Sequence, residues 1–174
     1  MKSTEFIQTK FDDLFIIKFK SIPDNRGLFI KPYISEDFNK HFGTIEEIYF
    51  SFSSKRTFRG LHFQKGLFAQ KKFIIPITGS IIHTAIDLRK NKKTYKKIFM
   101  QQFDSKDPFG VLVPEGFANG FYAKADCCIM NMSNAKYSPK DELGISYLSV
   151  PELTNLDVEF ISEKDKYLPG INEY

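Results

Sequence analysis

Short apolar runs separated by turn residues recur along this 174-residue chain, and they restrict its fold more than any other feature. Glycine, proline, asparagine and aspartate separate most of these runs, as they do between β-strands. Strands are predicted over residues 14–19, 28–33, 47–53, 60–64, 72–77, 80–88, 96–103, 110–113, 120–123 and 127–132. Short strands at this spacing are typical of a sandwich or barrel, so the sequence predicts an all-β fold.

Alternation within the run at 80–88 predicts which side chains share a face. With a period of two, Ile81, His83, Ala85 and Asp87 lie on the same side of that strand. The composition agrees with strands, since aromatic residues make up 16% of the chain, with 19 Phe and 8 Tyr, and such residues favour pleated, half-buried surfaces.

Two segments fall outside the strand pattern. Residues 35–43 begin with a serine suited to capping and end at Gly43, which predicts a short helix. Residues 141–174 are loop-rich and interrupted by Pro151 and Pro169, and we expect this tail to wrap the barrel. The prediction is a single domain over residues 1–174, with one or two short helices.

Charge and cysteine content narrow the possible partners. The 25 Lys and Arg exceed the 21 Asp and Glu by only four, and they are dispersed, which argues against nucleic acid and suits an anionic small ligand. Cys127 and Cys128 are adjacent, so they form neither a disulfide framework nor zinc-site spacing. No cleavable leader or membrane span is recognisable, and we expect a cytoplasmic protein with no membrane partner.

Residues 58–64 hold the densest group of side chains capable of chemistry. Alternation places His62 and Gln64 on one face, with Arg59 three residues before the histidine and Lys72 at the start of the next strand. Histidine titrates near neutral pH and is suited to proton transfer, but a strand histidine is also common as a structural residue.

An ordered set of motifs resembles the dTDP-4-dehydrorhamnose 3,5-epimerase family. The matching segments are 24–27 (Asp-Asn-Arg-Gly), 59–64, 85–89 (Ala-Ile-Asp-Leu-Arg), 114–117 (Pro-Glu-Gly-Phe), 137–139 and 161–165 (Ile-Ser-Glu-Lys-Asp), together with Gln70, Lys72 and Gly79. The resemblance runs from about residue 23 to residue 169. It implies a cupin-type β-jelly roll, a homodimer, no cofactor, and a nucleotide-diphosphate sugar held inside the barrel.

The same resemblance implies roles for individual residues. His62 resembles the family's general base, and Asp165 resembles the carboxylate that orients the imidazole. A carbon next to a ketone loses its proton readily only when the enolate is stabilised, and Lys72 stands where a cation can meet the oxyanion at C4. Arg59 and Arg26 resemble the pyrophosphate ligands, with Arg26 able to reach the neighbouring subunit's site.

Further positions are expected to contact the substrate. By the resemblance, Phe29 faces the nucleotide base, although core packing is an equal alternative for any Phe here. The remaining expected substrate contacts are Gln64, His83, Asn119, Asn131 and Tyr137.

Departures from the family pattern concentrate in the predicted site. Asn119 replaces a histidine, His83 an aspartate, and Asn131 the tyrosine that protonates the enolate from the face opposite the base. An amide cannot serve as that proton donor. Tyr137, Tyr49 or His83 would then have to supply the proton.

Three functions remain open from the sequence. The first is an isomerase that inverts C3, or C3 and C5, of a nucleotide-linked 4-keto-6-deoxy sugar in deoxysugar or surface polysaccharide biosynthesis. The second is a nucleotide-sugar 3,4-ketoisomerase, and the third is a binding protein that kept the fold without the chemistry. His62 and His83 together resemble only half of a cupin metal site, so no metal is expected.

Overall fold

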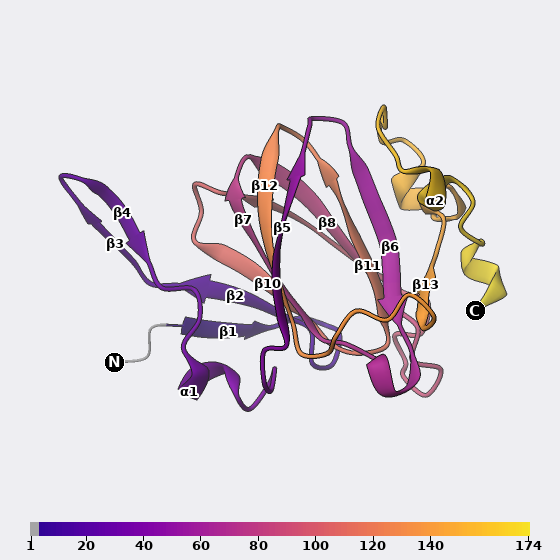
Figure 1. Ribbon diagram of the computed structural model, residues 1–174, viewed down its shortest axis with the longest axis horizontal. Helices are drawn as coiled ribbons and strands as arrows, with labels where there is room; N and C mark the ends of the chain where they lie inside the picture. The colour runs from indigo at the N-terminus through magenta and orange to yellow at the C-terminus, as the bar shows by residue number, and fades with distance from the viewer. Residues whose placement is uncertain (1–3) are drawn as a thin grey trace.

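Two antiparallel sheets form the body of the protein, described by a computed structural model over residues 4–174 (Figure 1). The six-stranded sheet has the order β1 (Thr4–Gln8), β2 (Phe15–Phe19), β10 (Phe109–Val113), β7 (Lys72–Thr78), β12 (Cys127–Ser133) and β5 (Glu47–Ser53). The five-stranded sheet has the order β13 (Glu142–Gly144), β6 (Phe58–Gln64), β11 (Phe117–Ala123), β8 (Ser80–Asp87) and β9 (Ile98–Asp104). This arrangement confirms the all-β jelly roll.

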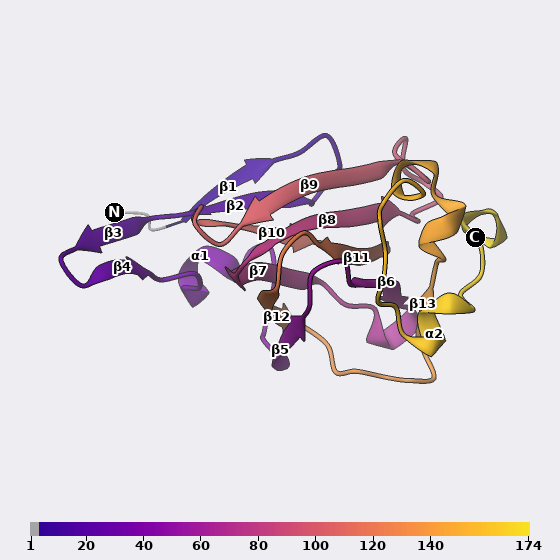
Figure 2. The ribbon, with the colours of Figure 1, turned by 90° about the horizontal axis from the view of Figure 1, so that it is seen from above.

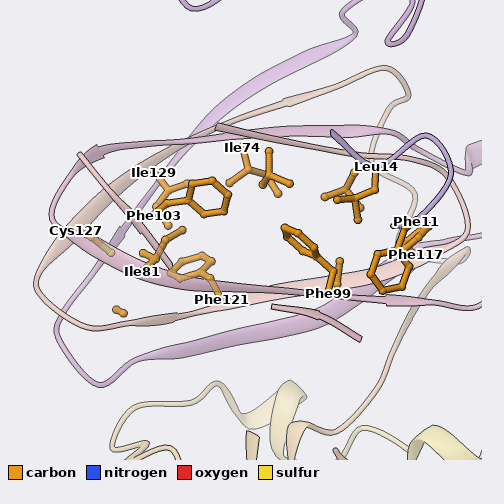
Figure 3. Close-up of a cluster of buried hydrophobic side chains, with 14 residues drawn as sticks. Phe11, Leu14, Ile74, Ile81, Phe99, Phe103, Phe117, Phe121, Cys127 and Ile129 are labelled. Atoms are coloured by element: carbon orange, nitrogen blue, oxygen red, sulfur yellow. The ribbon is translucent and has the colours of Figure 1, made fainter. Parts of the chain in front are cut away.

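The core lies between the two sheets because each sheet directs one apolar face inward. Figure 3 shows the central cluster, in which Ile74 and Ile129 from the six-stranded sheet meet Ile81, Phe99 and Phe121 from the five-stranded sheet. The alternation predicted for β8 is confirmed, since Ile81 and Ala85 belong to the central cluster whereas Ile86 packs in the cluster beneath the C-terminal tail. The phenylalanine-rich composition thus fills a barrel interior.

The C-terminal tail packs against the outer face of the five-stranded sheet. Val150 and Leu153 of the tail join Phe58, Leu61 and Ile86 in a buried cluster. The tail contains short helical turns, namely η2 (Tyr147–Ser149), η3 (Pro151–Leu153), α2 (Glu163–Lys166) and η4 (Ile171–Glu173). This packing holds α2 beside β6, as Figure 1 shows.

A two-stranded hairpin projects away from the barrel at the end opposite the tail. It is formed by β3 (Ser21–Asp24) and β4 (Gly27–Ile30), and both views show it extending from the body (Figures 1 and 2). Ile22, Leu28 and Phe29 are each at least half exposed there. We call this hairpin, residues 21–30, the arm.

Several predicted boundaries are wrong. The helix expected over 35–43 is a single turn, α1 (Ser35–Phe38), after which the chain bends toward Gly43, where φ is +88°. The strand expected over 28–33 ends at Ile30, and β1, β3 and β13 were not predicted, because short strands of mixed polarity carry little periodicity. No helix within residues 4–174 has the length and apolar character to span a membrane.

Candidate active site

A cleft of about 620 Å³ opens between the two sheets and is closed on one side by α2. Strands β5, β6, β7, β11 and β12 line it together with residues 160–165. Six of the predicted site residues lie around this cleft: Arg59, His62, Lys72, Asn119, Asn131 and Asp165. The fold therefore brings together residues separated by more than one hundred positions in the sequence.

His62 and Asp165 form a direct pair. The distance between His62 Nε2 and Asp165 Oδ1 is 2.7 Å, and the Gly60 backbone N–H donates to Asp165 Oδ2 at 3.1 Å. The Ser162 side chain caps α2 by accepting from the Asp165 backbone N–H at 3.1 Å, which fixes the start of the helix. Burial alone would raise the pKa of Asp165, but its hydrogen bond and charge interaction with His62 hold that pKa below the ordinary carboxyl value.

Two glycines allow β6 and β11 to approach closely beside this pair. At Gly60, where φ is +114°, an added Cβ would lie 2.8 Å from the Asn119 carbonyl oxygen. At Gly120, an added Cβ would lie 2.3 Å from the Arg59 carbonyl oxygen. Neither distance is tolerable, so both glycines are needed for the sheet to bring the Gly60 N–H to Asp165.

A second carboxylate, Glu142, lies on the other side of the His62 ring. Its Oε1 is 3.9 Å from His62 Nδ1, too far for a hydrogen bond, and its Oε2 accepts from Tyr137 Oη at 2.8 Å and from Lys164 Nζ. Burial would raise the pKa of Glu142, but the bonds from Lys164 and Tyr137 lower it overall. Sequence reasoning missed Glu142, because β13 is only three residues long and carries no clear alternation. It included Lys164 only as part of the motif at 161–165, without a role.

The six-stranded sheet supplies the wall opposite the His62 pair. Lys72 begins β7, and Asn131 on β12 is paired in register with Ile74 of β7 on one side and with Tyr49 of β5 on the other. Residues directly opposite in neighbouring strands point to the same face, which aligns Tyr49 and Asn131. Lys72 lies two residues before Ile74 and shares its face, and all of Lys72, Asn131 and Tyr49 line the cleft. In the five-stranded sheet, Asn119 on β11 is paired with His62 on β6, and its side chain donates to the His62 carbonyl at 3.3 Å.

Arg59 is held at the cleft by β5. Its Nε donates to Ser53 Oγ at 2.9 Å, and its Nη2 donates to the Phe52 carbonyl at 3.0 Å. These bonds fix the direction of the guanidinium, whose planar array of donors suits phosphate oxygens.

Three predicted contacts do not reach the cleft. Gln64 is buried and uses its side-chain amide on the backbone, donating to the carbonyls of Phe68 and Lys136 and accepting from the Ser138 N–H. His83 is fully buried in the barrel, and Tyr137 is half exposed with its hydroxyl directed to Glu142. Alternation along a strand predicts which face a side chain is on but not how deeply it is buried. The sequence therefore could not distinguish these three residues from those that line the cleft.

His83 is unusual even among buried residues. Neither of its ring nitrogens has a hydrogen-bond partner among the described residues. Burial, with a further contribution from the Lys72 charge, lowers the pKa of His83 to about 3. The imidazole is therefore neutral at physiological pH.

Arg26 and Phe29 lie on the arm, away from the cleft of their own chain (Figures 1 and 2). Arg26 forms an ion pair with Asp24 at 2.6 Å within the hairpin turn, and its side chain is largely exposed. Among residues 4–174, no three His, Cys, Asp or Glu side chains gather as a metal site.

Residues 8–173 match the sequence profile described as dTDP-4-dehydrorhamnose 3,5-epimerase. The chain belongs to the dTDP-4-dehydrorhamnose 3,5-epimerase family. The enzyme of that name from Methanothermobacter thermautotrophicus is 33% identical over 182 residues, which cover 99% of this chain and 97% of the relative. The predicted family is therefore confirmed over nearly the whole length.

Solved structures agree with this assignment. The crystal structure of the Sulfolobus tokodaii dTDP-4-dehydrorhamnose 3,5-epimerase matches with a TM-score of 0.90 and 31% identity, covering 99% of this chain and 97% of that one. The structure of the Legionella pneumophila dTDP-6-deoxy-D-glucose-3,5-epimerase, in complex with dTDP-4-keto-L-rhamnose, matches with a TM-score of 0.88 and 26% identity, covering 97% and 93%. The cupin-type jelly roll is thus shared with epimerases of this family.

Proposed function

We propose that this protein is an isomerase that removes a proton next to the ketone of a nucleotide-linked 4-keto-6-deoxy sugar, acting as a 3- or 3,5-epimerase. The observation that carries the proposal is the His62–Asp165 pair, at 2.7 Å, in a cleft that Lys72 also lines. A base, its orienting carboxylate and a cation are the groups that this proton transfer requires. Membership of the epimerase family supports the same reaction.

Asp165 determines which nitrogen of His62 acts as the base. Because Nε2 is bonded to the carboxylate, Nε2 carries the proton in the neutral ring and the lone pair lies on Nδ1. Nδ1 takes the proton from the carbon next to the ketone, and Asp165 stabilises the imidazolium that results. The electron pair of the broken C–H bond moves into the enolate, whose oxygen is stabilised by Lys72.

The nucleotide end of the substrate is assigned to the arginines. Arg59 is fixed at the cleft by β5 and can donate to a pyrophosphate oxygen. The related Legionella structure holds dTDP-4-keto-L-rhamnose, which supports a nucleotide sugar as the ligand. Asn119 and Asn131 line the cleft and supply amide groups for sugar hydroxyls.

We also propose a homodimer in which the arm of one subunit reaches the cleft of the other. The apolar residues of the arm are exposed within one chain, and β5 is an open sheet edge that exposes Ile48 and Phe50. Exposed strand edges and apolar patches are usually covered in natural proteins. Arg26 and Phe29 would then act on the partner's nucleotide, and sedimentation at micromolar concentration should give a dimer.

Substrate turnover in deuterated water tests the function. The native protein should exchange deuterium into C3 of a 4-keto-6-deoxy sugar linked to dTDP, GDP, UDP or CDP, and the matching nucleoside diphosphate should raise the melting temperature. A 3-keto product without inversion would instead identify a 3,4-ketoisomerase. Tight binding with no exchange from any of the four would identify a binding protein, which the Asn131 replacement also permits. If none of the four diphosphates changes the melting temperature and no sugar exchanges, the nucleotide-sugar proposal is wrong.

A further inference from the structure

The cleft contains a proton donor on β5, at the position paired with Asn131. Tyr49 is directly opposite Asn131 in the antiparallel register of β5 and β12, and both residues line the cleft with His62 and Lys72. Cβ atoms of directly opposite residues are about 4.5–5.5 Å apart and point to the same face. The Tyr49 phenol therefore enters the part of the cleft that the Asn131 side chain also faces.

Strand alternation and sheet order place Tyr49 across the cleft from the base. Tyr49, Ser51 and Ser53 alternate along β5 and line the cleft, as does the exposed Phe52, whereas Ile48 and Phe50 are exposed and do not line it. Tyr49 comes from the six-stranded sheet, while His62 comes from the five-stranded sheet. A sugar ring between the two sheets would meet the imidazole on one face and the phenol on the other.

The other tyrosine and the other histidine considered from the sequence are unsuited to proton return. Tyr137 Oη already donates to Glu142, and this bond raises the pKa of the phenol, which makes it a weaker acid. Tyr137 also does not line the cleft. His83 has no exposed surface and stays neutral down to a pH of about 3, so it neither reaches a ligand nor carries the proton to be donated.

Tyr49, unlike Tyr137 and His83, lines the cleft and is partly exposed. Its hydroxyl makes no hydrogen bond within residues 4–174, and 38% of the residue is exposed in the single chain. We propose that Tyr49 is the general acid that delivers a proton to the sugar carbon on the face opposite His62. This inference rests on the proposed epimerase function and names the residue that completes it.

The step balances without any added reactant. His62 takes the proton from C3, and the C–H electron pair forms the enolate. The enolate carbon then takes the proton of Tyr49 Oη on its opposite face, which inverts the carbon and leaves a tyrosinate. Exchange with water removes the proton from His62 and returns one to Tyr49, so both residues regain their starting forms.

The Tyr49→Phe variant tests the proposed acid while leaving the base in place. The variant keeps His62, so deuterium should still enter C3 with retention of configuration, while formation of the inverted sugar should fall about 10²-fold or more. His62→Ala should abolish both exchange and inversion. Tyr167→Phe, at an exposed tyrosine that does not line the cleft, is the matched control, and it should leave the ratio of inversion to exchange unchanged.

A relocated phenol provides the rescue. The double variant Tyr49→Phe/Asn131→Tyr places the phenol on the paired strand at the directly opposite position, and it should recover inversion. Unchanged inversion by Tyr49→Phe would overturn the assignment of Tyr49, as would a native protein that exchanges C3 without ever inverting it. Absence of exchange in the native protein would instead refute the proposed function itself, so the two failures are distinguishable.

Discussion

The cleft and the arm differ in whether their side chains are buried and bonded within a single chain. In the cleft, Asp165 is 4% exposed and its carboxylate bonds both His62 and the Gly60 backbone. On the arm, Phe29 is 57% exposed, and the ion pair of Arg26 is with Asp24 in the same turn. The comparison indicates that the proposed proton-transfer groups are assembled within one chain, whereas the nucleotide contacts proposed for Arg26 and Phe29 of the arm would depend on a second.

The low stability expected of an isolated arm also favours its packing on a second chain. An isolated two-stranded hairpin is at best marginally stable in water. Because Leu28 and Phe29 are already about half buried, covering each of them would contribute roughly half of the ~1.5–3 kcal/mol of full burial, about 1 kcal/mol. A surface on a second subunit could therefore supply the stability that the arm does not obtain from its own barrel.

His62→Ala should have the largest effect, because it removes the base from the self-contained region. We expect deuterium exchange at C3 to fall about 10³-fold, since general-base catalysis typically contributes about 10²–10⁴-fold. The melting temperature should also fall, because the buried Asp165 carboxylate loses its partner. His41→Gln, a histidine beside α1 rather than in the cleft, is the control and should exchange at the native rate. Near-native exchange by His62→Ala would place the base elsewhere.

Asp165→Asn should reduce exchange by a smaller factor, about 10²-fold at the low end of the general-base range, because the base remains but loses its orienting charge. It should also cost about 2 kcal/mol of unfolding free energy at pH 7, as a hydrogen-bonded buried charge is removed. The pKa of Asp165 is lowered in the folded protein, so this stabilisation is present above the unfolded pKa of about 3.9 and is lost as the pH falls through the folded value.

Urea unfolding at pH 7 and again near pH 3 measures that dependence. The difference between the native protein and Asp165→Asn should shrink at the lower pH. Asp157→Asn, which alters an exposed ion pair with Arg56, is the matched control and should change the unfolding free energy by less than about 0.5 kcal/mol. A constant difference across this pH range would show that the Asp165 charge is not what stabilises the fold.

Arg26→Ala should reduce kcat/KM about 10-fold, mainly through KM, and it tests whether the arm serves a second chain. Mixing this variant with His62→Ala should restore activity, because a mixed dimer contains one site with an intact cleft and an intact arm. Random exchange of subunits gives about a quarter of the native activity for a symmetric dimer. Lys106→Ala is the charge-matched control. No recovery on mixing, with dimer exchange verified by sedimentation, would mean that the arm does not complete the partner's site.

Phe29→Ser should have the smallest effect on a single chain. At protein concentrations too low for dimerisation, the unfolding free energy should change by less than about 0.5 kcal/mol, because the side chain is already exposed. The buried Phe103→Ala is the contrasting variant and should cost about 3–5 kcal/mol. At higher concentration, Phe29→Ser should lose the rise in melting temperature that dimerisation gives the native protein. A large cost at low concentration would mean that the arm packs on its own barrel.

The sequence predicted the barrel well because its strands alternate. The run over 80–88 identified a face whose residues are all buried, and the ordered motifs led to His62 and Asp165, which lie 2.7 Å apart. The predicted helix over 35–43 was too long, because a capping serine and a terminal glycine do not determine how many turns form between them.

The rest of the cleft depends on strand register, which local patterns do not contain. Tyr49 and Asn131 are paired across strands that are far apart in the sequence. That both side chains line the same cleft therefore follows only from the assembled sheet. Gln64 and His62 share a strand, yet the loop carbonyls around Gln64 take up its amide. Depth and loop position, rather than alternation, decide which polar residues meet a ligand.

The close backbone approach at Gly60 has a consequence for how this protein can change. Gly60 donates its N–H to Asp165, and its lack of a side chain allows β6 to lie close to β11. A substitution at Gly60 therefore alters both contacts at once. A substitution at Gly60 cannot be accommodated by small adjustments of its neighbours, since even one added carbon would collide with the Asn119 backbone. Adaptation to new substrates is therefore expected to proceed through Tyr49, Asn131 and other side chains on the opposite wall, where a replacement leaves the His62–Asp165 geometry intact.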